Sequence, residues 1–190
     1  MKRIVIFASG SGSNAENLVA YFNNSDIASV VQILTNNPQA KVLDRAKRLK
    51  VSALSFNKVA LTETNDVLNL LKATKPDLIV LAGFLWKFPE AIINEYPNKV
   101  INVHPALLPK FGGKGMYGMN VHQAVVENKE TETGITIHYV NENYDEGAII
   151  FQAKCVVDAK DTAEDVAAKI HELEMEHFPK VVEQLLTKQN

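Results

Sequence analysis

The chain begins with Ile4-Val5-Ile6-Phe7-Ala8, followed at once by Ser9-Gly10-Ser11-Gly12-Ser13-Asn14. The first segment is continuously apolar, as expected of a strand that other elements cover on both faces. The second is a glycine-rich turn, and helical periodicity begins after it, over residues 15–22. A strand, a tight turn and a helix in this order predict the right-handed βαβ connections of a parallel sheet.

Strand-like and helix-like segments keep alternating through the first hundred residues. The predicted strands cover residues 4–8, 30–34, 53–56, 78–82 and 98–103, and the predicted helices cover 15–22, 38–49 and 65–73. This alternation favours a three-layer α/β/α fold with a Rossmann-like, mostly parallel sheet. In such a fold ligands bind beyond the carboxyl ends of the strands, so residues that follow strands are the first candidates for a site.

The second half of the chain has a different pattern. A glycine-rich loop is predicted over 111–120, a helix over 121–128, and an antiparallel strand pair over 134–140 and 148–157. A long final helix opens at Asp161-Thr162-Ala163-Glu164, which has capping-box character, and we expect Pro179 to kink it. The sequence therefore predicts about seven strands, antiparallel in the C-terminal portion, in a single domain over residues 1–190.

The composition is that of an ordinary globular protein. Of 190 residues, 46% are hydrophobic and 22% charged, and the net charge of −2 offers no basic surface for nucleic acid. The only cysteine, Cys155, excludes an intramolecular disulfide, and its valine neighbours predict a buried strand thiol. No apolar run approaches the ~18 residues of a membrane span, and run 4–8 is shorter than an export signal needs. We predict a cytoplasmic protein that binds neither nucleic acid nor membranes.

The turn at residues 9–14 is suited to binding an anion. Its glycines allow close backbone approach, and the helix that follows offers free N–H groups. As a dinucleotide fingerprint, the turn would require an acidic residue roughly 20 positions later. The second predicted strand instead ends in Leu34-Thr35-Asn36-Asn37. The phosphate of a small substrate is the preferred interpretation, and a dinucleotide or a purely structural turn are the alternatives.

A polar cluster, Asn102-Val103-His104-Pro105, follows the fifth predicted strand. Pro105 biases His104 away from helical conformation, so an amide and an imidazole emerge together at a strand end. The pair suits catalysis, because His ionises near neutral pH and Asn can donate to a developing oxyanion. Asp145 beside His104 would raise the pKa of the imidazole, although an Asp before Glu-Gly is also typical of a turn.

The remaining ionisable side chains have structural explanations. We predict His122 on a helix surface, His138 as a lining or core residue of a strand, and Glu174 as a solvated helix carboxylate. His171 and His177 are six positions apart and do not share a helix face. The sequence contains no HExxH motif and no Cys/His cluster, so no metal site is predicted.

Four segments occur in the order found in a known family. They are Ser9-Gly10-Ser11-Gly12-Ser13-Asn14, Leu81-Ala82-Gly83-Phe84, Asn102-Val103-His104-Pro105-Ala106-Leu107-Leu108-Pro109-Lys110 and Asp145-Glu146-Gly147. Through them the chain resembles the phosphoribosylglycinamide formyltransferases, folate-dependent enzymes of purine (IMP) biosynthesis. The resemblance implies two small-molecule substrates, 5'-phosphoribosylglycinamide (glycinamide ribonucleotide) and the co-substrate 10-formyltetrahydrofolate, without a metal. It also implies a monomer or weak homodimer.

The resemblance assigns roles to individual residues. The catalytic trio would be Asn102, His104 and Asp145. The residues that would hold the ribonucleotide are Gly12, Ser13, Asn14 and Glu174, and those that would bind folate are Leu85, Trp86, Lys87, Phe88, Asn102 and Asn141. Many relatives have an arginine where this chain has Trp86, so Lys87 is the candidate for the contact to the folate tail. The loop 111–120 is longer than in many relatives, and we expect it to be a mobile element over the substrate cleft, with a poorly ordered surface loop as the alternative.

The same resemblance implies direct transfer. The glycinamide amine would attack the formyl carbon, and Asn102 and a protonated His104 would stabilise the negative charge on the formyl oxygen. Asp145 would keep His104 charged and orient a water that carries a proton from the attacking amine to the leaving nitrogen.

Other functions fit the sequence less well. Methionyl-tRNA formyltransferase would need a tRNA-binding domain and a basic surface, and formyltetrahydrofolate hydrolase an additional N-terminal domain. The turn 9–14 disfavours a sugar-nucleotide formyltransferase. A dinucleotide-dependent oxidoreductase would need an acidic residue after the second strand, and this chain has none there. A non-catalytic binding module would not require the complete trio.

Overall fold

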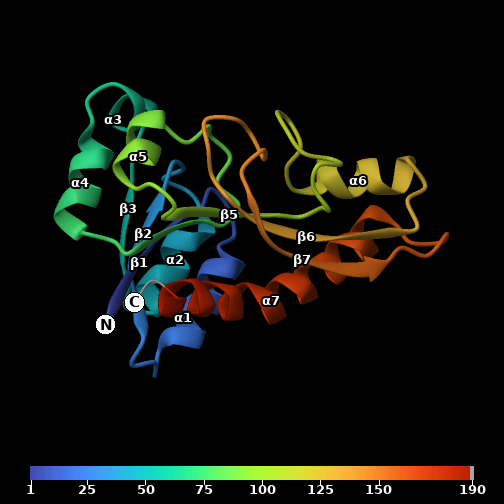
Figure 1. Ribbon diagram of the computed structural model, residues 1–190, viewed down its shortest axis with the longest axis horizontal. Helices are drawn as coiled ribbons and strands as arrows, with labels where there is room; N and C mark the ends of the chain where they lie inside the picture. Colours follow the sequence, from blue (N-terminus) through green and yellow to red (C-terminus); the bar gives the residue numbers. More distant parts are fainter. Residues whose placement is uncertain (189–190) are drawn as a thin grey trace.

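The computed structural model describes residues 1–188, which form one seven-stranded sheet with the order β3-β2-β1-β4-β5-β6-β7 (Figure 1). The strands are β1 (Lys2–Phe7), β2 (Ala28–Thr35), β3 (Ser52–Ser55), β4 (Leu78–Leu81), β5 (Val100–His104), β6 (Glu132–Tyr139) and β7 (Ile149–Val156). Strands β1 to β5 pair in parallel, and β6 runs antiparallel to both β5 and β7. The predicted α/β sheet, mostly parallel with an antiparallel C-terminal portion, is confirmed.

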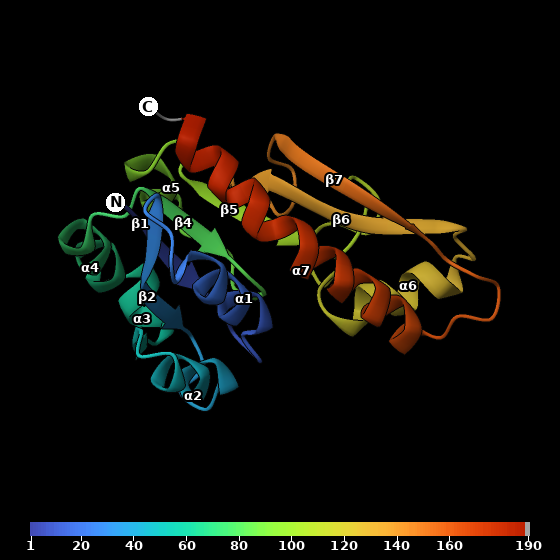
Figure 2. The ribbon, with the colours of Figure 1, turned by 90° about the horizontal axis from the view of Figure 1, so that it is seen from below.

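Helices cover both faces of this sheet. They are α1 (Ser13–Phe22), α2 (Lys41–Arg48), α3 (Lys58–Thr62), α4 (Asp66–Thr74), α5 (Glu90–Glu95), α6 (Met119–Glu127) and α7 (Ala163–Lys188). Helices α1, α2 and α7 pack on one face and α3, α4 and α5 on the other, while α6 packs against α7 and β6 (Figures 1 and 2). None of the helices in the described part of the chain is long and apolar enough to cross a membrane.

Strand β1 lies at the centre of the fold. Its side chains alternate between the two faces: Ile4 and Ile6 pack beneath α1 and α7, whereas Val5 and Phe7 pack beneath α4 and α5. All four side chains are fully buried, and burial of each contributes about 1.5–3 kcal/mol. The turn that follows β1 is therefore anchored to the most rigid part of the protein.

Several details of the sequence-based prediction are corrected. Helices α3 and α5 were not predicted, because at 5 and 6 residues they are too short to show helical periodicity. The capping box of α7 is formed by Thr162 and Asp165: the Asp165 N–H donates to Thr162 Oγ1 (3.2 Å), and the Thr162 N–H donates to Asp165 Oδ2 (2.9 Å). Pro179 lies inside α7 without ending it.

Strands β2 and β3 lie on one side of β1, and β4 and the later strands lie on its other side. The order in which the chain adds strands to the sheet therefore reverses at β1. Ligand sites in open α/β sheets form at such a point, beyond the carboxyl ends of the strands. Here the loops after β1 and β4 are bonded to each other: the Ser9 N–H donates to the Gly83 carbonyl (3.0 Å), and the Leu85 N–H donates to Ser9 Oγ (3.0 Å). Strand β5 ends beside them, so the turn 9–14, the residues after β4 and the Asn102–His104 segment meet at one edge of the sheet.

Candidate active site

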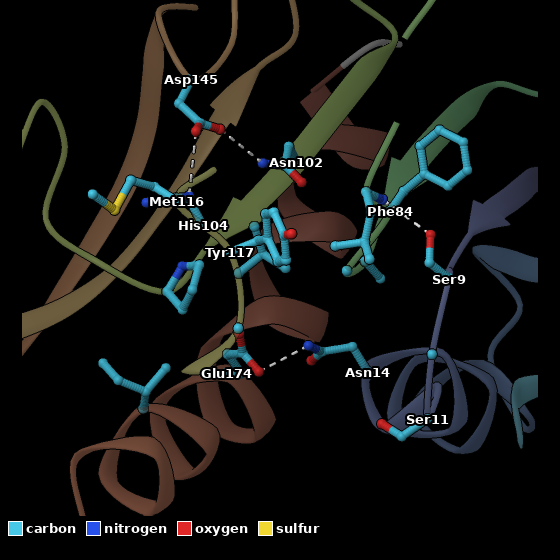
Figure 3. Close-up of a pocket in the computed structure, with 18 of the residues that line it drawn as sticks. Ser9, Ser11, Asn14, Phe84, Asn102, His104, Met116, Tyr117, Asp145 and Glu174 are labelled. Atoms are coloured by element: carbon cyan, nitrogen blue, oxygen red, sulfur yellow. Dashed lines mark hydrogen bonds and ion pairs between the residues drawn. The ribbon is translucent and has the colours of Figure 1, made fainter. Parts of the chain in front are cut away.

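A cavity of about 730 Å³ lies at this edge of the sheet (Figure 3). Its walls come from the turn 9–14, residues 82–85 after β4, residues 102–105 at the end of β5, the loop 113–118, Asp145, and α6 and α7. The phosphate-binding turn 9–14 and the catalytic candidates Asn102, His104 and Asp145 therefore share one cavity, although Gly12–Asn14 and the trio are about 90 to 130 positions apart in the chain.

The turn 9–14 forms one end of the cavity. Gly12 has φ +76° and acts as the N-cap of α1, and a Cβ at this position would lie 2.3 Å from Val42 Cγ2. Only glycine combines this left-handed conformation with such close packing. The first N–H groups of α1, including those of Ser13 and Asn14, have no acceptor within the helix, so they are available to an anion.

Asn14 and Glu174 connect the turn to α7 across the cavity. Asn14 Nδ2 donates to Glu174 Oε2 at 2.9 Å, and both residues line the cavity (Figure 3). Burial raises the pKa of Glu174 to about 7, and the hydrogen bond from Asn14 only partly opposes this. The prediction of a solvated helix carboxylate for Glu174 is corrected, because the side chain lies in the cavity wall.

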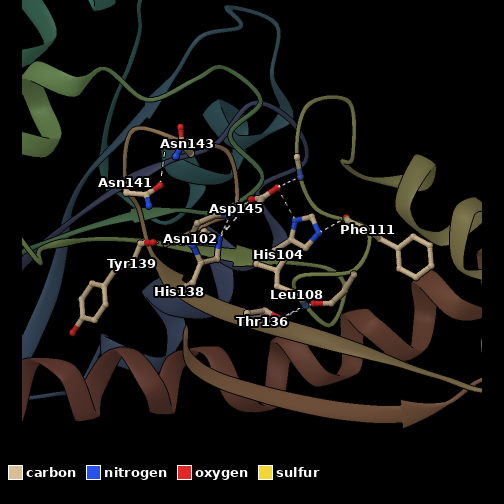
Figure 4. Close-up of polar contacts among 12 residues, drawn as sticks. Asn102, His104, Leu108, Phe111, Thr136, His138, Tyr139, Asn141, Asn143 and Asp145 are labelled. Carbon is tan, nitrogen blue, oxygen red and sulfur yellow. Dashed lines mark hydrogen bonds and ion pairs between the residues drawn. The ribbon is translucent and has the colours of Figure 1, made fainter. Parts of the chain in front are cut away.

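The trio of Asn102, His104 and Asp145 forms the other end of the cavity (Figures 3 and 4). His104 Nδ1 lies 3.6 Å from Asp145 Oδ2, and Asn102 Nδ2 lies 3.5 Å from Asp145 Oδ1. The Gly113 N–H also donates to Asp145 Oδ2, at 3.0 Å. Asp145 has φ +57°, a left-handed conformation that is costly for a residue other than glycine and is held here by these contacts.

The expected charge of His104 is corrected. Burial lowers the pKa of His104 below its ordinary value of 6.5, and the negative charge of Asp145 and the Phe111 carbonyl only partly oppose this. His104 Nε2 carries a hydrogen, because it lies 2.8 Å from the Phe111 carbonyl oxygen, which can only accept. Nδ1, which faces Asp145, is therefore the atom that gains the second proton when the ring becomes charged.

Asp145 remains ionised beside this neutral ring. Burial raises its pKa, but the neighbouring His138 and His104 rings when they are protonated, together with the hydrogen bond from the Gly113 N–H, lower it more. The net pKa is below the ordinary value of 3.8. A negative charge thus stands next to Nδ1 of His104 at neutral pH.

His138 is a polar partner that the sequence indicated only as lining or core. The antiparallel register places it opposite Asn102, and the two side chains are 3.1 Å apart between Asn102 Nδ2 and His138 Nε2 (Figure 4). His138 Nδ1 lies 2.8 Å from the Tyr139 carbonyl, so it donates there and leaves Nε2 as an acceptor. His138 therefore fixes which way the Asn102 amide points.

The turn after β5 is held by a buried polar cluster around Thr136. Thr136 Oγ1 donates to the Ala106 carbonyl (2.7 Å) and accepts from the Leu108 N–H (3.0 Å). Gln152 Nε2 donates to Thr136 Oγ1 (2.9 Å) and to the Leu108 carbonyl (3.1 Å). This cluster fixes the path from His104 to Phe111, whose carbonyl accepts the hydrogen bond from the His104 ring.

His122 is the other residue whose placement was wrong. It was predicted on a helix surface, but its side chain is 6% exposed and lines the cavity. Burial and the neighbouring His104 lower its pKa. A second neutral imidazole therefore belongs to the cavity wall.

The predicted folate residues lie in different environments. Leu85 and Asn102 line the cavity. Trp86 packs edge-on against Phe56 and Phe84 outside it, and Phe88 is 5% exposed in the core beneath α5. Asn141 accepts the Asn143 N–H in the loop that leads to Asp145 (Figure 4). Within residues 1–188, no three His, Cys, Asp or Glu side chains are grouped so that they could hold a metal ion.

Comparison with known proteins gives a consistent result. The family model described as "Formyl transferase" matches residues 2–182. The phosphoribosylglycinamide formyltransferase of Bacillus subtilis is 35% identical over 98% of this chain and 95% of its own length. The chloroplastic phosphoribosylglycinamide formyltransferase of Arabidopsis thaliana is 35% identical over 95% of this chain, which spans 64% of that protein.

Solved structures agree with the sequence comparison. Glycinamide ribonucleotide transformylase 1 from Symbiobacterium toebii has a TM-score of 0.90 at 29% identity and covers 99% of this chain, with 89% of its own chain covered. The corresponding protein from Geobacillus kaustophilus has a TM-score of 0.89 at 34% identity, with 98% and 99% covered.

Proposed function

This chain belongs to the formyl transferase family, and from that membership we propose that it is a phosphoribosylglycinamide formyltransferase of de novo purine biosynthesis. It transfers the formyl group of 10-formyltetrahydrofolate to the amine of 5'-phosphoribosylglycinamide. The observation that carries this function is that an anion-binding turn and an Asn–His–Asp trio line the same cavity. The turn suits the phosphate of the acceptor and the trio suits chemistry at a carbonyl.

The acceptor would lie between the turn 9–14 and α7. Gly12, Ser13 and Asn14 would bind its phosphate through their backbone N–H groups, and Glu174 would contact its polar groups. The glycinamide amine would then reach toward Asn102 and His104. Leu85 would pack against the pterin of the folate, Trp86, Lys87 and Asn141 would shape the outer part of that site, and Phe88 would support it from the core.

In the proposed reaction the amine nitrogen forms a bond to the formyl carbon, and the bond from that carbon to N10 of the folate breaks. The proton released by the amine is transferred to N10. Asn102 donates to the oxygen that becomes negative. The His104 ring takes up the proton from the amine as the tetrahedral intermediate forms, Asp145 stabilises the resulting imidazolium, and the ring passes this proton to N10 as the bond to that nitrogen breaks.

The proposal is tested with purified protein, glycinamide ribonucleotide and 10-formyltetrahydrofolate, by following the formylated product. His104→Ala should lower kcat by at least about 100-fold while changing the affinity for either substrate little. His177→Ala, in a partly exposed residue of α7, is the matched control and should retain wild-type turnover. Near-normal turnover in His104→Ala would refute the role of His104. Formylation of methionyl-tRNA without formylation of the ribonucleotide would refute the function.

Both proposed substrates are small molecules, and we propose that the reaction takes place in the cytoplasm in a single-domain protein. Size-exclusion chromatography with light scattering tests the prediction of a monomer or weak homodimer.

A further inference from the structure

Helix α2 is bonded to the outer side of the turn 9–14. The Val42 N–H, in the first turn of α2, donates to the Gly10 carbonyl at 3.1 Å. One helical turn further on, Arg45 Nε donates to the Ser11 carbonyl at 2.7 Å. Two successive carbonyl groups of the turn are therefore directed at α2. None of the described residues that line the cavity belongs to α2, so this helix supports the turn from behind.

The direction of these carbonyl groups determines the direction of the N–H groups. In a trans peptide the C=O and N–H bonds point to opposite sides of the chain. The Ser11 carbonyl points to Arg45, so the Gly12 N–H points away from α2. By the same reasoning, the bond from Val42 to the Gly10 carbonyl turns the Ser11 N–H away from α2. The N–H groups of Ser11 and Gly12 therefore both point away from α2 and toward the cavity.

Arg45 is held in place by a second interaction. Its Nη1 pairs with Glu16 Oε2, and Glu16 lies in the first turn of α1, where its N–H donates to the Gly12 carbonyl (2.9 Å). Arg45 thus connects α2 to both ends of the Ser11–Gly12 segment. Arg48 also pairs with Glu16, through Oε1, but its side chain is 63% exposed and is not bonded to the turn.

We propose that Arg45 is a positioning residue for the phosphate of the acceptor: it fixes the Ser11–Gly12 peptide so that the Gly12 N–H points at the anion. The inference rests on the proposed function for the identity of the substrate, but the anion-binding geometry of the turn does not. Arg45 does not touch the phosphate, and it acts through the Ser11 carbonyl. Its positive charge behind the turn adds a favourable field for an anion.

Binding of ribose 5-phosphate, measured by isothermal titration calorimetry, tests the proposal separately from catalysis. Arg45→Met removes the bond to Ser11 and should weaken binding about tenfold. Arg45→Lys keeps the positive charge but not the paired geometry, so it should bind with intermediate affinity. Arg48→Met removes the other Glu16 partner, and it is the matched control, with binding within about twofold of wild type.

Kinetics give a second readout. In Arg45→Met the KM for glycinamide ribonucleotide should rise by about the same factor as the dissociation constant, with kcat and the KM for 10-formyltetrahydrofolate within about twofold of wild type. A loss of kcat without a change in the KM for the ribonucleotide would indicate a general structural role and overturn the inference. If Arg45→Met does not fold, Arg45→Lys decides, because the inference requires that it bind ribose 5-phosphate more weakly than Arg48→Met.

Failure of this inference and failure of the proposed function are distinguishable. A wild-type protein that formylates the ribonucleotide, with Arg45→Met binding ribose 5-phosphate as wild type does, refutes the inference alone. A wild-type protein that binds ribose 5-phosphate in an Arg45-dependent way but transfers no formyl group refutes the function alone. A wild-type protein that does not bind ribose 5-phosphate refutes the inference directly.

Discussion

The buried carboxyl of Glu174 predicts how the stability of the protein depends on pH. Its pKa rises from the ordinary 4.5 to about 7 in the folded protein. The folded state therefore holds this proton more tightly than the unfolded chain does. The contribution of Glu174 to stability is complete below about pH 4.5 and is lost as the pH rises through about 7.

The size of the effect follows from the same values. Each pKa unit corresponds to about 1.36 kcal/mol, so a rise from 4.5 to about 7 corresponds to about 3.4 kcal/mol. Because the side chain borders a cavity open to water, we expect about 1–3 kcal/mol. Glu174→Gln cannot ionise and still accepts the hydrogen bond from Asn14. The stability of the variant relative to wild type should rise from pH 5 to pH 7 and reach its largest value, of about this amount, at pH 8.

Urea denaturation of both proteins at pH 5, 6, 7 and 8, in buffers without phosphate, measures the difference. Histidines that titrate in this range affect wild type and variant equally, so the difference isolates Glu174. Glu176→Gln, two positions further along α7 in an exposed side chain, is the control and should show no pH-dependent difference. A difference between Glu174→Gln and wild type that stays constant from pH 5 to pH 8 would refute the raised pKa.

Three further predictions concern the cavity wall and the buried turn behind it. Gly12→Ala places a Cβ 2.3 Å from Val42 Cγ2 at positive φ, and should lower the free energy of unfolding by about 2–4 kcal/mol in urea denaturation. Asp145→Asn removes the charge that raises the pKa of His104, so kcat should fall by at least about 100-fold and the remaining activity should shift to more acidic pH in a pH–rate profile. Thr136→Val leaves the Leu108 N–H without its acceptor and should cost about 1–3 kcal/mol in the same denaturation assay.

Each of these predictions has a result that contradicts it. Gly10→Ala is the control for Gly12→Ala, because a Cβ at Gly10 meets nothing within 4 Å, and equal losses in the two variants would contradict the argument from Val42. An unchanged pH–rate profile in Asp145→Asn would contradict the coupling to His104. Wild-type stability of Thr136→Val would show that its hydrogen bonds contribute nothing net.

The sequence was sufficient to predict the fold and the residues at the strand ends. Continuous apolar runs such as Ile4–Ala8 and Leu78–Ala82 identify strands that are buried on both faces. Parallel strands have their carboxyl ends at the same edge of the sheet, so the sequence alone predicts that Ser9–Asn14 and Asn102–His104 lie close together. The turn 9–14 and the pair of Asn102 and His104 could be predicted because each is a local sequence motif.

Features that depend on pairing between distant elements could not be predicted in this way. His138 faces Asn102 because of the antiparallel register, which no local pattern specifies. His122 was assigned to a helix surface because the position of α6 against α7 and β6 is a tertiary property. The neutral state of His104 was missed for a related reason: a partner carboxylate can be inferred from sequence, but the depth of burial that outweighs it cannot.

The register between β5 and β6 also makes catalysis a measure of correct folding. Asn102 lies opposite His138 and His104 opposite Thr136, across a connection of nearly thirty residues that includes α6. A slip of one residue would turn these side chains to the other face of the sheet. Recovery of enzyme activity during refolding therefore requires that these two strands have aligned, and formation of the helices alone would not restore it.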